Sequence, residues 1–234
     1  MSEPRESHFI VRSRFLVLLG MLVLLLLIAP IVVATGLPVG VASVTMSAVL
    51  NGLLLSSVFA VCTRRRQAVI AVSLVSIVIV LQVVSAVIDS NAIEATRLAL
   101  GIATLGYVLA LLFIHLFTGT GVTMDTIAAS LCVYLLIGVL WSMIYLLIEV
   151  AIPGSFRYVY AENEPLLTNF AGQSSIFSLY LSFATLTTLG YGDLVPVSNP
   201  ARMFAVVEAI VGQVYLAVLV ARLVGMHIAE SFRS

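Results

Sequence analysis

The run TTLGYGD, residues 187–193, carries the clearest chemical signal in the chain. Glycine adopts left-handed backbone conformations without steric cost, and Gly190 and Gly192 alternate with larger residues. In an ordinary strand, successive carbonyl groups point to opposite sides. Backbone that alternates normal with left-handed residues instead turns consecutive carbonyls to one side. The main-chain oxygens of residues 188–191, with the Thr188 hydroxyl at the inner end, could therefore replace the water shell of a bare potassium ion.

The residues before this run predict a short helix over 174–187. At about 1.5 Å per residue it would reach only some 20 Å, less than the roughly 30 Å of a bilayer's hydrocarbon core. We expect a re-entrant element, in which the helix dips into the membrane and the chain returns. Non-helical backbone at that depth is tolerated only where it is buried in protein or lines a watery cavity. The helix would also direct the partial negative charge of its C-terminus at a waiting cation.

Composition places the chain in a membrane. Of the 234 residues, 62% are hydrophobic and only 9% are charged, whereas soluble domains carry about 25% charged residues. The first apolar run is longer than the roughly 7–15 residues of a signal-peptide core, so we expect a retained helix. A helix needs about 20 mostly apolar residues to cross the bilayer, and we predict six such spans: Phe15–Ala34, Val41–Cys62, Ala68–Ile88, Thr96–Phe117, Ile127–Val150 and Met203–Met226.

The run from Thr188 to Asp193, behind a pore helix and between two spans, resembles the filter signature of the potassium channel superfamily, in its bacterial two-helix pore-domain branch. The likeness covers roughly residues 127–227. It leaves the first four spans unassigned. Together with the six predicted spans, it implies an all-α membrane protein with six transmembrane helices, a re-entrant pore helix and a selectivity filter, forming a tetrameric channel. The pore domain would span 126–228, with pore helix 174–187, filter 188–193 and inner helix 202–227. A four-helix region (15–125) and tails at 1–14 and 229–234 would complete the chain.

In this resemblance the filter residues bind K+ through main-chain oxygens; they are Thr188, Leu189, Gly190, Tyr191 and Gly192. Leu189 stands where Val or Ile is commoner, but only its carbonyl is used, so we expect selectivity to survive.

The resemblance also implies supports for the filter. Asp193 would brace it through a pore-helix side chain, and Thr187 lies at the junction. The usual pair of tryptophans is replaced by Tyr180 and Leu181, which makes Tyr180 the candidate partner of Asp193. The alternative for Asp193 is a solvated acid that concentrates cations at the outer mouth.

Three positions of the last span have two interpretations each. Gly212 would be a gating hinge by the resemblance, or a small residue that allows close helix packing. Gln213 would face a cavity below the filter, or form an interhelical hydrogen bond. Val220 would lie near the cytoplasmic gate, by the resemblance.

Glu208 is a carboxylate inside the membrane, where acids are costly and usually functional. We expect it behind the filter, hydrogen-bonded to pore-helix hydroxyls such as those of Ser182 or Thr185. The alternative is a carboxylate that reaches the outer surface.

The charges set the orientation. All eleven basic residues are Arg, and by the positive-inside rule those before the first span and after the second are cytoplasmic. Both termini are therefore predicted to be cytoplasmic, in the inner (plasma) membrane. The groups are Arg5, Arg12 and Arg14, then Arg64, Arg65 and Arg66; the opposite side collects Asp89, Glu94, Glu162, Glu164 and Asp193. We expect Arg222 and Arg233 to anchor the last span at the interface, where anionic lipid lies.

Arg97 does not make a voltage sensor, because a sensor needs several arginines at three-residue spacing. Leu100 and Ala103 stand at the next two such positions. Arg97 is expected to anchor the helix end or to pair with Glu94 or Asp89.

One chain supplies one filter strand, and one strand cannot encircle an ion, so the mechanism requires a homotetramer. The sequence thus predicts a passive potassium-selective channel without a voltage sensor and with no cofactor beyond K+ itself. The alternatives are a weakly selective monovalent cation channel and a non-conducting regulatory or scaffold subunit. The sequence offers no catalytic constellation, so we expect no enzyme. Zero net charge argues against a nucleic-acid partner, and the gating stimulus, including any separate regulatory chain, is left open.

Overall fold

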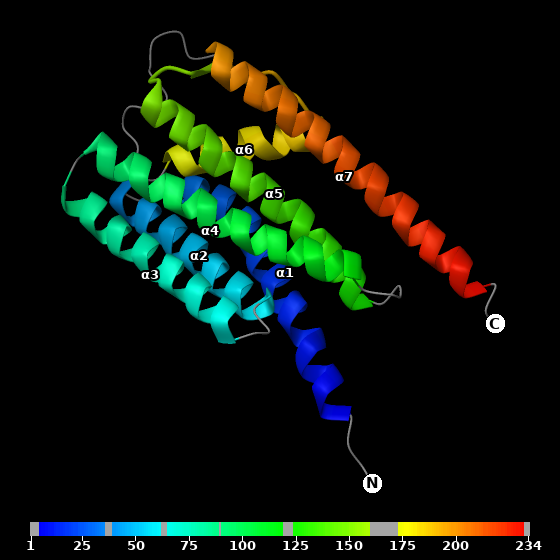
Figure 1. Ribbon diagram of the computed structural model, residues 1–234. Coiled ribbons are helices and arrows are strands. Elements are labelled where there is room, and N and C mark those ends of the chain that lie inside the picture. The colour runs from blue at the N-terminus through cyan, green and yellow to red at the C-terminus, as the bar shows by residue number, and fades with distance from the viewer. Residues whose placement is uncertain are drawn as a thin grey trace.

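The computed structural model describes residues 5–35, 39–61, 65–88, 90–118, 124–159 and 173–231. Seven helices and two short strands follow one another along these residues (Figure 1). In chain order they are α1 (Arg5–Ala34), α2 (Val39–Val61), α3 (Arg65–Val87), α4 (Asn91–Thr118), α5 (Met124–Ala151), β1 (Phe156–Tyr158), α6 (Gln173–Leu186), β2 (Leu194–Pro196) and α7 (Asn199–Ser231).

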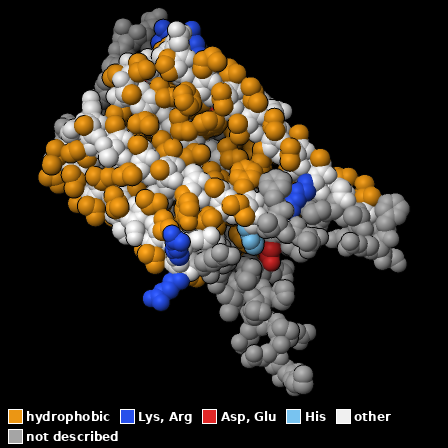
Figure 2. Space-filling view, in the orientation of Figure 1, with side chains coloured by type: hydrophobic (Ala, Val, Ile, Leu, Met, Phe, Trp, Pro, Cys, Tyr) orange, Lys and Arg blue, Asp and Glu red, His pale blue; other side chains and the backbone are white. Residues whose placement is uncertain are grey.

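Six of these helices are long and apolar enough to cross a membrane, and α6 is the short apolar helix between the last two. This confirms the predicted number and order of spans, so the protein is a multi-pass membrane protein. Hydrophobic side chains cover the middle of the visible face, and arginine side chains gather toward its ends (Figure 2). That distribution suits a bundle with a hydrocarbon belt and two polar interfaces.

The helix bounds differ from the predicted spans mainly at the ends. Helix α1 already begins at Arg5, so most of the predicted tail is helical, and α6 covers 173–186 instead of 174–187. Helix α7 begins at Asn199 rather than at residue 202. The Ser198 hydroxyl accepts a hydrogen bond from the Ala201 N–H at 3.3 Å, an N-cap that a hydropathy window does not register. Pro200 follows in the first turn, where its missing N–H is harmless.

The first five helices pack into one bundle, in which α1 contacts α2 and α5, and α4 contacts α3 and α5. Helix α6 lies between α5 and α7 (Figure 1). The N-terminal end of α1 and the C-terminal end of α7 lie at the same end of the bundle. Five charged residues of the orientation argument lie outside the described residues: Arg64, Asp89, Glu162, Glu164 and Arg233.

A two-stranded antiparallel sheet joins the segment that follows α5 to the segment that precedes α7. Strand β1 pairs with β2, with Phe156 opposite Pro196 and Tyr158 opposite Leu194. Phe156 and Leu194 are buried in a small apolar cluster with Tyr145, Leu181 and Ala201, which belong to α5, α6 and α7. The sheet and this cluster therefore hold the chain on both sides of residues 187–193.

Candidate functional site

The backbone of residues 188–192 alternates in handedness. Thr188, Gly190 and Gly192 have φ angles of 58°, 52° and 75°, whereas Leu189 and Tyr191 between them do not have positive φ. The two glycines were expected in this conformation. Thr188 was not, because a side chain in the left-handed region costs about 1–2 kcal/mol. The alternation is the backbone pattern that turns consecutive carbonyls to one side.

Residues 187–193, here called the returning strand, are connected to the last turn of α6 by main-chain hydrogen bonds. The Thr188 N–H donates to the Thr185 carbonyl at 3.0 Å, and the Gly190 N–H donates to the Ala184 carbonyl at 3.2 Å. These bonds satisfy carbonyls that a helix C-terminus leaves without intrahelical partners. The Thr187 hydroxyl donates to the Phe183 carbonyl at 2.6 Å, so this residue contacts its own helix end. Two N–H groups of the strand are thus held by α6.

Residues 187–192 are exposed on the surface of the single chain. Leu189 is 52% exposed and Tyr191 is 70% exposed. Both side chains lie next to the C-terminal end of α6, where they can contact another chain or lipid.

The C-terminal end of the returning strand is held by Asp193. The Tyr180 hydroxyl lies 2.8 Å and 2.9 Å from the two carboxylate oxygens of Asp193, which confirms the predicted contact. The Asp193 carboxylate also accepts the Leu194 N–H at 3.0 Å, and its main-chain carbonyl accepts the Val159 N–H at 2.7 Å. Burial, and then the hydrogen bond to Asp193, raise the pKa of Tyr180 to about 12. The phenol therefore remains a donor at physiological pH.

Glu208 is fully buried, with 0% exposure, on the side of α7 that meets α5 and α6. One of its carboxyl oxygens lies 2.5 Å from the Ser182 hydroxyl, and the other accepts a hydrogen bond from the Tyr145 hydroxyl. The predicted contact with a pore-helix hydroxyl is confirmed, and the alternative of a carboxylate at the outer surface is wrong. Three helices therefore meet at this one carboxyl group.

The hydrogen-bond contacts of Ser182 indicate the protonation state of Glu208. The Ser182 oxygen lies 2.7 Å from the Gly138 carbonyl oxygen as well as 2.5 Å from Glu208. A hydroxyl has one proton, so it can donate to only one of these two oxygens. If it donates to Gly138, which is an acceptor only, the second contact needs its proton from Glu208. The arrangement is fully hydrogen-bonded when Glu208 is a neutral carboxylic acid.

Gly212 allows α7 to approach the end of α6. A Cβ atom at residue 212 would lie 2.6 Å from the Leu186 carbonyl oxygen and 2.9 Å from its Cδ1. The structure therefore gives Gly212 the packing role, and a hinge at this position stays a prediction. Gln213 and Val220 are exposed on α7, so this chain offers Gln213 no buried interhelical position.

Three residues of α5 that contact this region were not among the predicted site residues. Tyr145 meets Glu208, Tyr134 donates to the Leu186 carbonyl at 3.4 Å, and Gly138 makes room for the Phe183 ring, whose Cζ would be 2.7 Å from an added Cβ. A glycine in the middle of a membrane helix is a recognisable signal of close packing. The two tyrosines carry no comparable signal in the sequence.

Arg97 of α4 pairs with Glu94. Its Nε donates to Glu94 Oε2 at 2.9 Å, and a second guanidinium nitrogen contacts Oε1 of the same carboxylate. This confirms one of the two predicted partners; the other, Asp89, lies outside the described residues.

The comparisons with known proteins bear on the same region. Residues 129–228 match a family model described as ion channel, and these residues include most of α5, the whole of α6 and the returning strand, and nearly all of α7. No curated protein and no solved structure matches the chain. Helices α1 to α4 lie outside the matched region.

Proposed function

We propose that this chain, whose C-terminal part is an ion channel domain preceded by additional apolar helices, forms a homotetrameric potassium-selective channel. Conduction would be passive, driven by the electrochemical gradient, and no enzymatic step is involved. The observation that carries the proposal is the alternation of φ at Thr188, Gly190 and Gly192 on a strand suspended from α6.

The selection step follows from this backbone. Four strands around one axis would stack rings of carbonyl oxygens from residues 188–191, with Thr188 hydroxyls below them. Such rings replace the hydration shell of K+ as it enters. The C-terminal end of each α6 would add partial negative charge below the rings. Tyr180 and Asp193 would hold the outer end of each strand, and Glu208 would hold α6 against α5 and α7.

Two surfaces of the single chain support assembly around an axis. The side chains of Leu189 and Tyr191 are exposed beside the strand. Helix α7 is also mostly exposed along its apolar window, as α3 is, although α5 is largely buried. The strand, and the part of α7 that packs against α6, would meet the other copies if the strands faced a common axis. A cyclic assembly closes the ring without leaving an open contact surface.

Gating by voltage through α4 is not part of the proposal. Arg97 lies near the N-terminal end of α4 and is paired with Glu94, and apolar residues occupy the next sensor-spaced positions. We further propose that both termini face the cytoplasm and that the channel lies in the inner membrane, because Arg65 and Arg66 follow the second span.

Ion flux from liposomes that contain the purified protein tests the proposal. Wild-type protein is expected to pass K+ much faster than Na+, and Gly190→Ala is expected to abolish flux, because residue 190 has φ of 52°. Gly106→Ala is the matched control, since a Cβ there meets nothing within 4 Å.

Two other flux results would each favour one of the alternative functions. Equal K+ and Na+ flux would favour the weakly selective cation channel, and a silent tetramer would favour the non-conducting scaffold. Cross-linking should give four subunits of 25.0 kDa. A particle of any other stoichiometry would refute the mechanism.

A further inference from the structure

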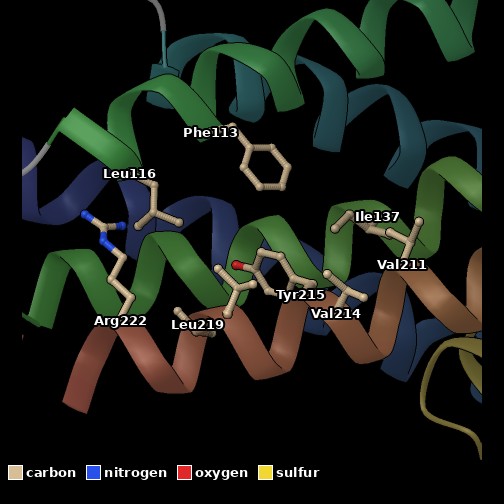
Figure 3. Close-up of a pocket in the computed structure, with 9 residues that line it drawn as sticks. Phe113, Leu116, Ile137, Val211, Val214, Tyr215, Leu219 and Arg222 are labelled. Carbon is tan, nitrogen blue, oxygen red and sulfur yellow. The ribbon is translucent and has the colours of Figure 1, made fainter. Parts of the chain in front are cut away.

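An apolar groove runs along α7 where this helix diverges from α4 and α5. Its cavity has a volume of about 220 Å³. The lining residues come from all three helices: Phe113 and Leu116 from α4, Ile137 from α5, and Val211, Val214, Tyr215, Val218, Leu219 and Arg222 from α7. Figure 3 shows Arg222 and Leu116 at one end of the groove and Val211 and Ile137 at the other.

The walls of the groove are apolar over most of their length. Tyr215 is the polar exception in the middle, but its hydroxyl donates to the Ser130 carbonyl at 2.7 Å. Its ring packs edge-on against Phe113, with 6.0 Å between centroids, and is stacked with Tyr134 at 5.9 Å. These contacts hold the tyrosine ring as part of the wall, with its hydroxyl directed at α5. The middle of the groove therefore offers a ligand only apolar contact.

The groove lies within the membrane-crossing windows of its helices, which are Asn91–Leu116, Asp125–Ala151 and Asn199–Gly225. A cavity with apolar walls does not hold water. In a bilayer the surrounding solvent is hydrocarbon chain, so an acyl chain can enter from the side.

Arg222 sets the charge at one end of the groove. It is half-buried and stands just before Gly225, the last residue of the crossing window. A guanidinium group matches a phosphate geometrically and has N–H donors for more than one acceptor. The apolar length and the terminal cation together fit an amphiphile with an anionic head.

A second copy of the chain would be a poorer partner for the positive charge of Arg222. Between Asn199 and Gly225, α7 has one acidic residue, Glu208, and this side chain is fully buried. The same window of another copy's α7 would therefore bring its own Arg222 and no accessible carboxylate, whereas every anionic phospholipid brings a phosphate.

We propose that this groove binds an anionic phospholipid, with one acyl chain along α7 and the phosphate on Arg222. The site depends on the membrane setting and not on potassium conduction. Because α4 supplies Phe113 and Leu116, the lipid would contact both the N-terminal bundle and the last helix. It would thereby provide a physical connection between the two parts of the chain.

Native mass spectrometry of the delipidated, full-length protein tests this site. The probes are phosphatidylglycerol and phosphatidylcholine with identical acyl chains, added separately in the same detergent. Wild-type protein is expected to retain phosphatidylglycerol preferentially. Arg222→Gln is expected to lower that preference about fivefold, as loss of one basic contact with anionic lipid would do.

Arg202→Gln is the matched control, because Arg202 is exposed at the other end of the same helix. A second pair of variants tests the apolar part. Val214→Trp should displace both lipids, whereas Val206→Trp, at a similarly exposed position outside the groove, should displace neither.

Equal loss of preference in Arg222→Gln and Arg202→Gln would overturn the proposal, as would wild-type protein that retains no lipid. If Val214→Trp changed the subunit stoichiometry and left bound lipid unchanged, a second copy would be the occupant and the lipid site would be refuted. None of these measurements uses ion flux, so a failed lipid site and a failed channel remain distinguishable.

Discussion

Replacing Glu208 tests the buried hydrogen-bond cluster that joins α5, α6 and α7. In Glu208→Gln the amide can donate to Ser182 and accept from Tyr145, so both contacts of the neutral acid are kept. In Glu208→Leu the volume is similar, but the Tyr145 hydroxyl, which belongs to a residue only 1% exposed, loses its acceptor. Ser182 still donates to the Gly138 carbonyl.

The expected magnitudes follow from this count. An unsatisfied buried polar group costs about 1–3 kcal/mol, so Glu208→Leu should lower the unfolding free energy by about that amount. Glu208→Gln should change it by less than about 1 kcal/mol. Adding Tyr145→Phe to Glu208→Leu removes the orphaned hydroxyl, so the double variant should recover most of the loss, with a coupling energy of about 1–3 kcal/mol.

The assay is unfolding of the purified protein by sodium dodecyl sulfate in mixed micelles, followed by circular dichroism at neutral pH. If Glu208→Gln destabilised the protein as much as Glu208→Leu, a charged carboxylate would be required and the neutral form would be wrong. If Tyr145→Phe gave no recovery in the Glu208→Leu background, Tyr145 would not be the group left unsatisfied.

Further predictions concern the contact of Gly212 with Leu186 and the contact of Tyr180 with Asp193. Gly212→Ala should destabilise the packing of α7 on α6 by about 1–3 kcal/mol, because its Cβ would meet the Leu186 carbonyl oxygen at 2.6 Å; the same unfolding assay checks this. Gly225→Ala, where a Cβ meets nothing within 4 Å, should be neutral or slightly stabilising, since alanine is the better helix former. Tyr180→Phe should lower the K+ over Na+ flux ratio in liposomes, because Asp193 loses its hydrogen bond to α6; an unchanged ratio would remove this contact from the filter supports. The raised pKa of Tyr180 means that its contribution to stability is fully present below about pH 10 and is lost as the pH rises through about 12. Wild-type and Tyr180→Phe stabilities measured from pH 7 to 12 should therefore converge only at the alkaline end.

The returning strand shows how far the sequence could predict the site. Two glycines at alternate positions predicted left-handed backbone at 190 and 192, and both have positive φ. Thr188 has it too, at 58°, and a threonine in a sequence gives no reason to expect this. The conformation is maintained where the Thr188 N–H bonds to the Thr185 carbonyl, and this contact exists only once the chain has returned against α6.

The hydrogen-bond partners of Glu208 show a second limit of prediction from the sequence. A pore-helix hydroxyl was expected, and Ser182 supplies it. Tyr145 was not expected, because it lies 63 positions earlier in an apolar helix. When nearly every residue of a membrane helix is apolar, periodicity does not show which face meets protein and which meets lipid. The rotation of α5 about its axis therefore had to come from the packed structure.

The amino-acid sequence alone determined the number of crossings, the half-length helix and the glycine positions of the returning strand. These are properties of short segments: the hydropathy of a window about as long as the bilayer is thick, and the backbone freedom of a residue without a side chain. Only the tertiary structure decided that Gly212 meets Leu186, that Tyr145 meets Glu208 and that a groove opens beside Arg222. Such contacts depend on how helices cross and rotate against one another, and side chains that are all comparably apolar leave that choice to packing.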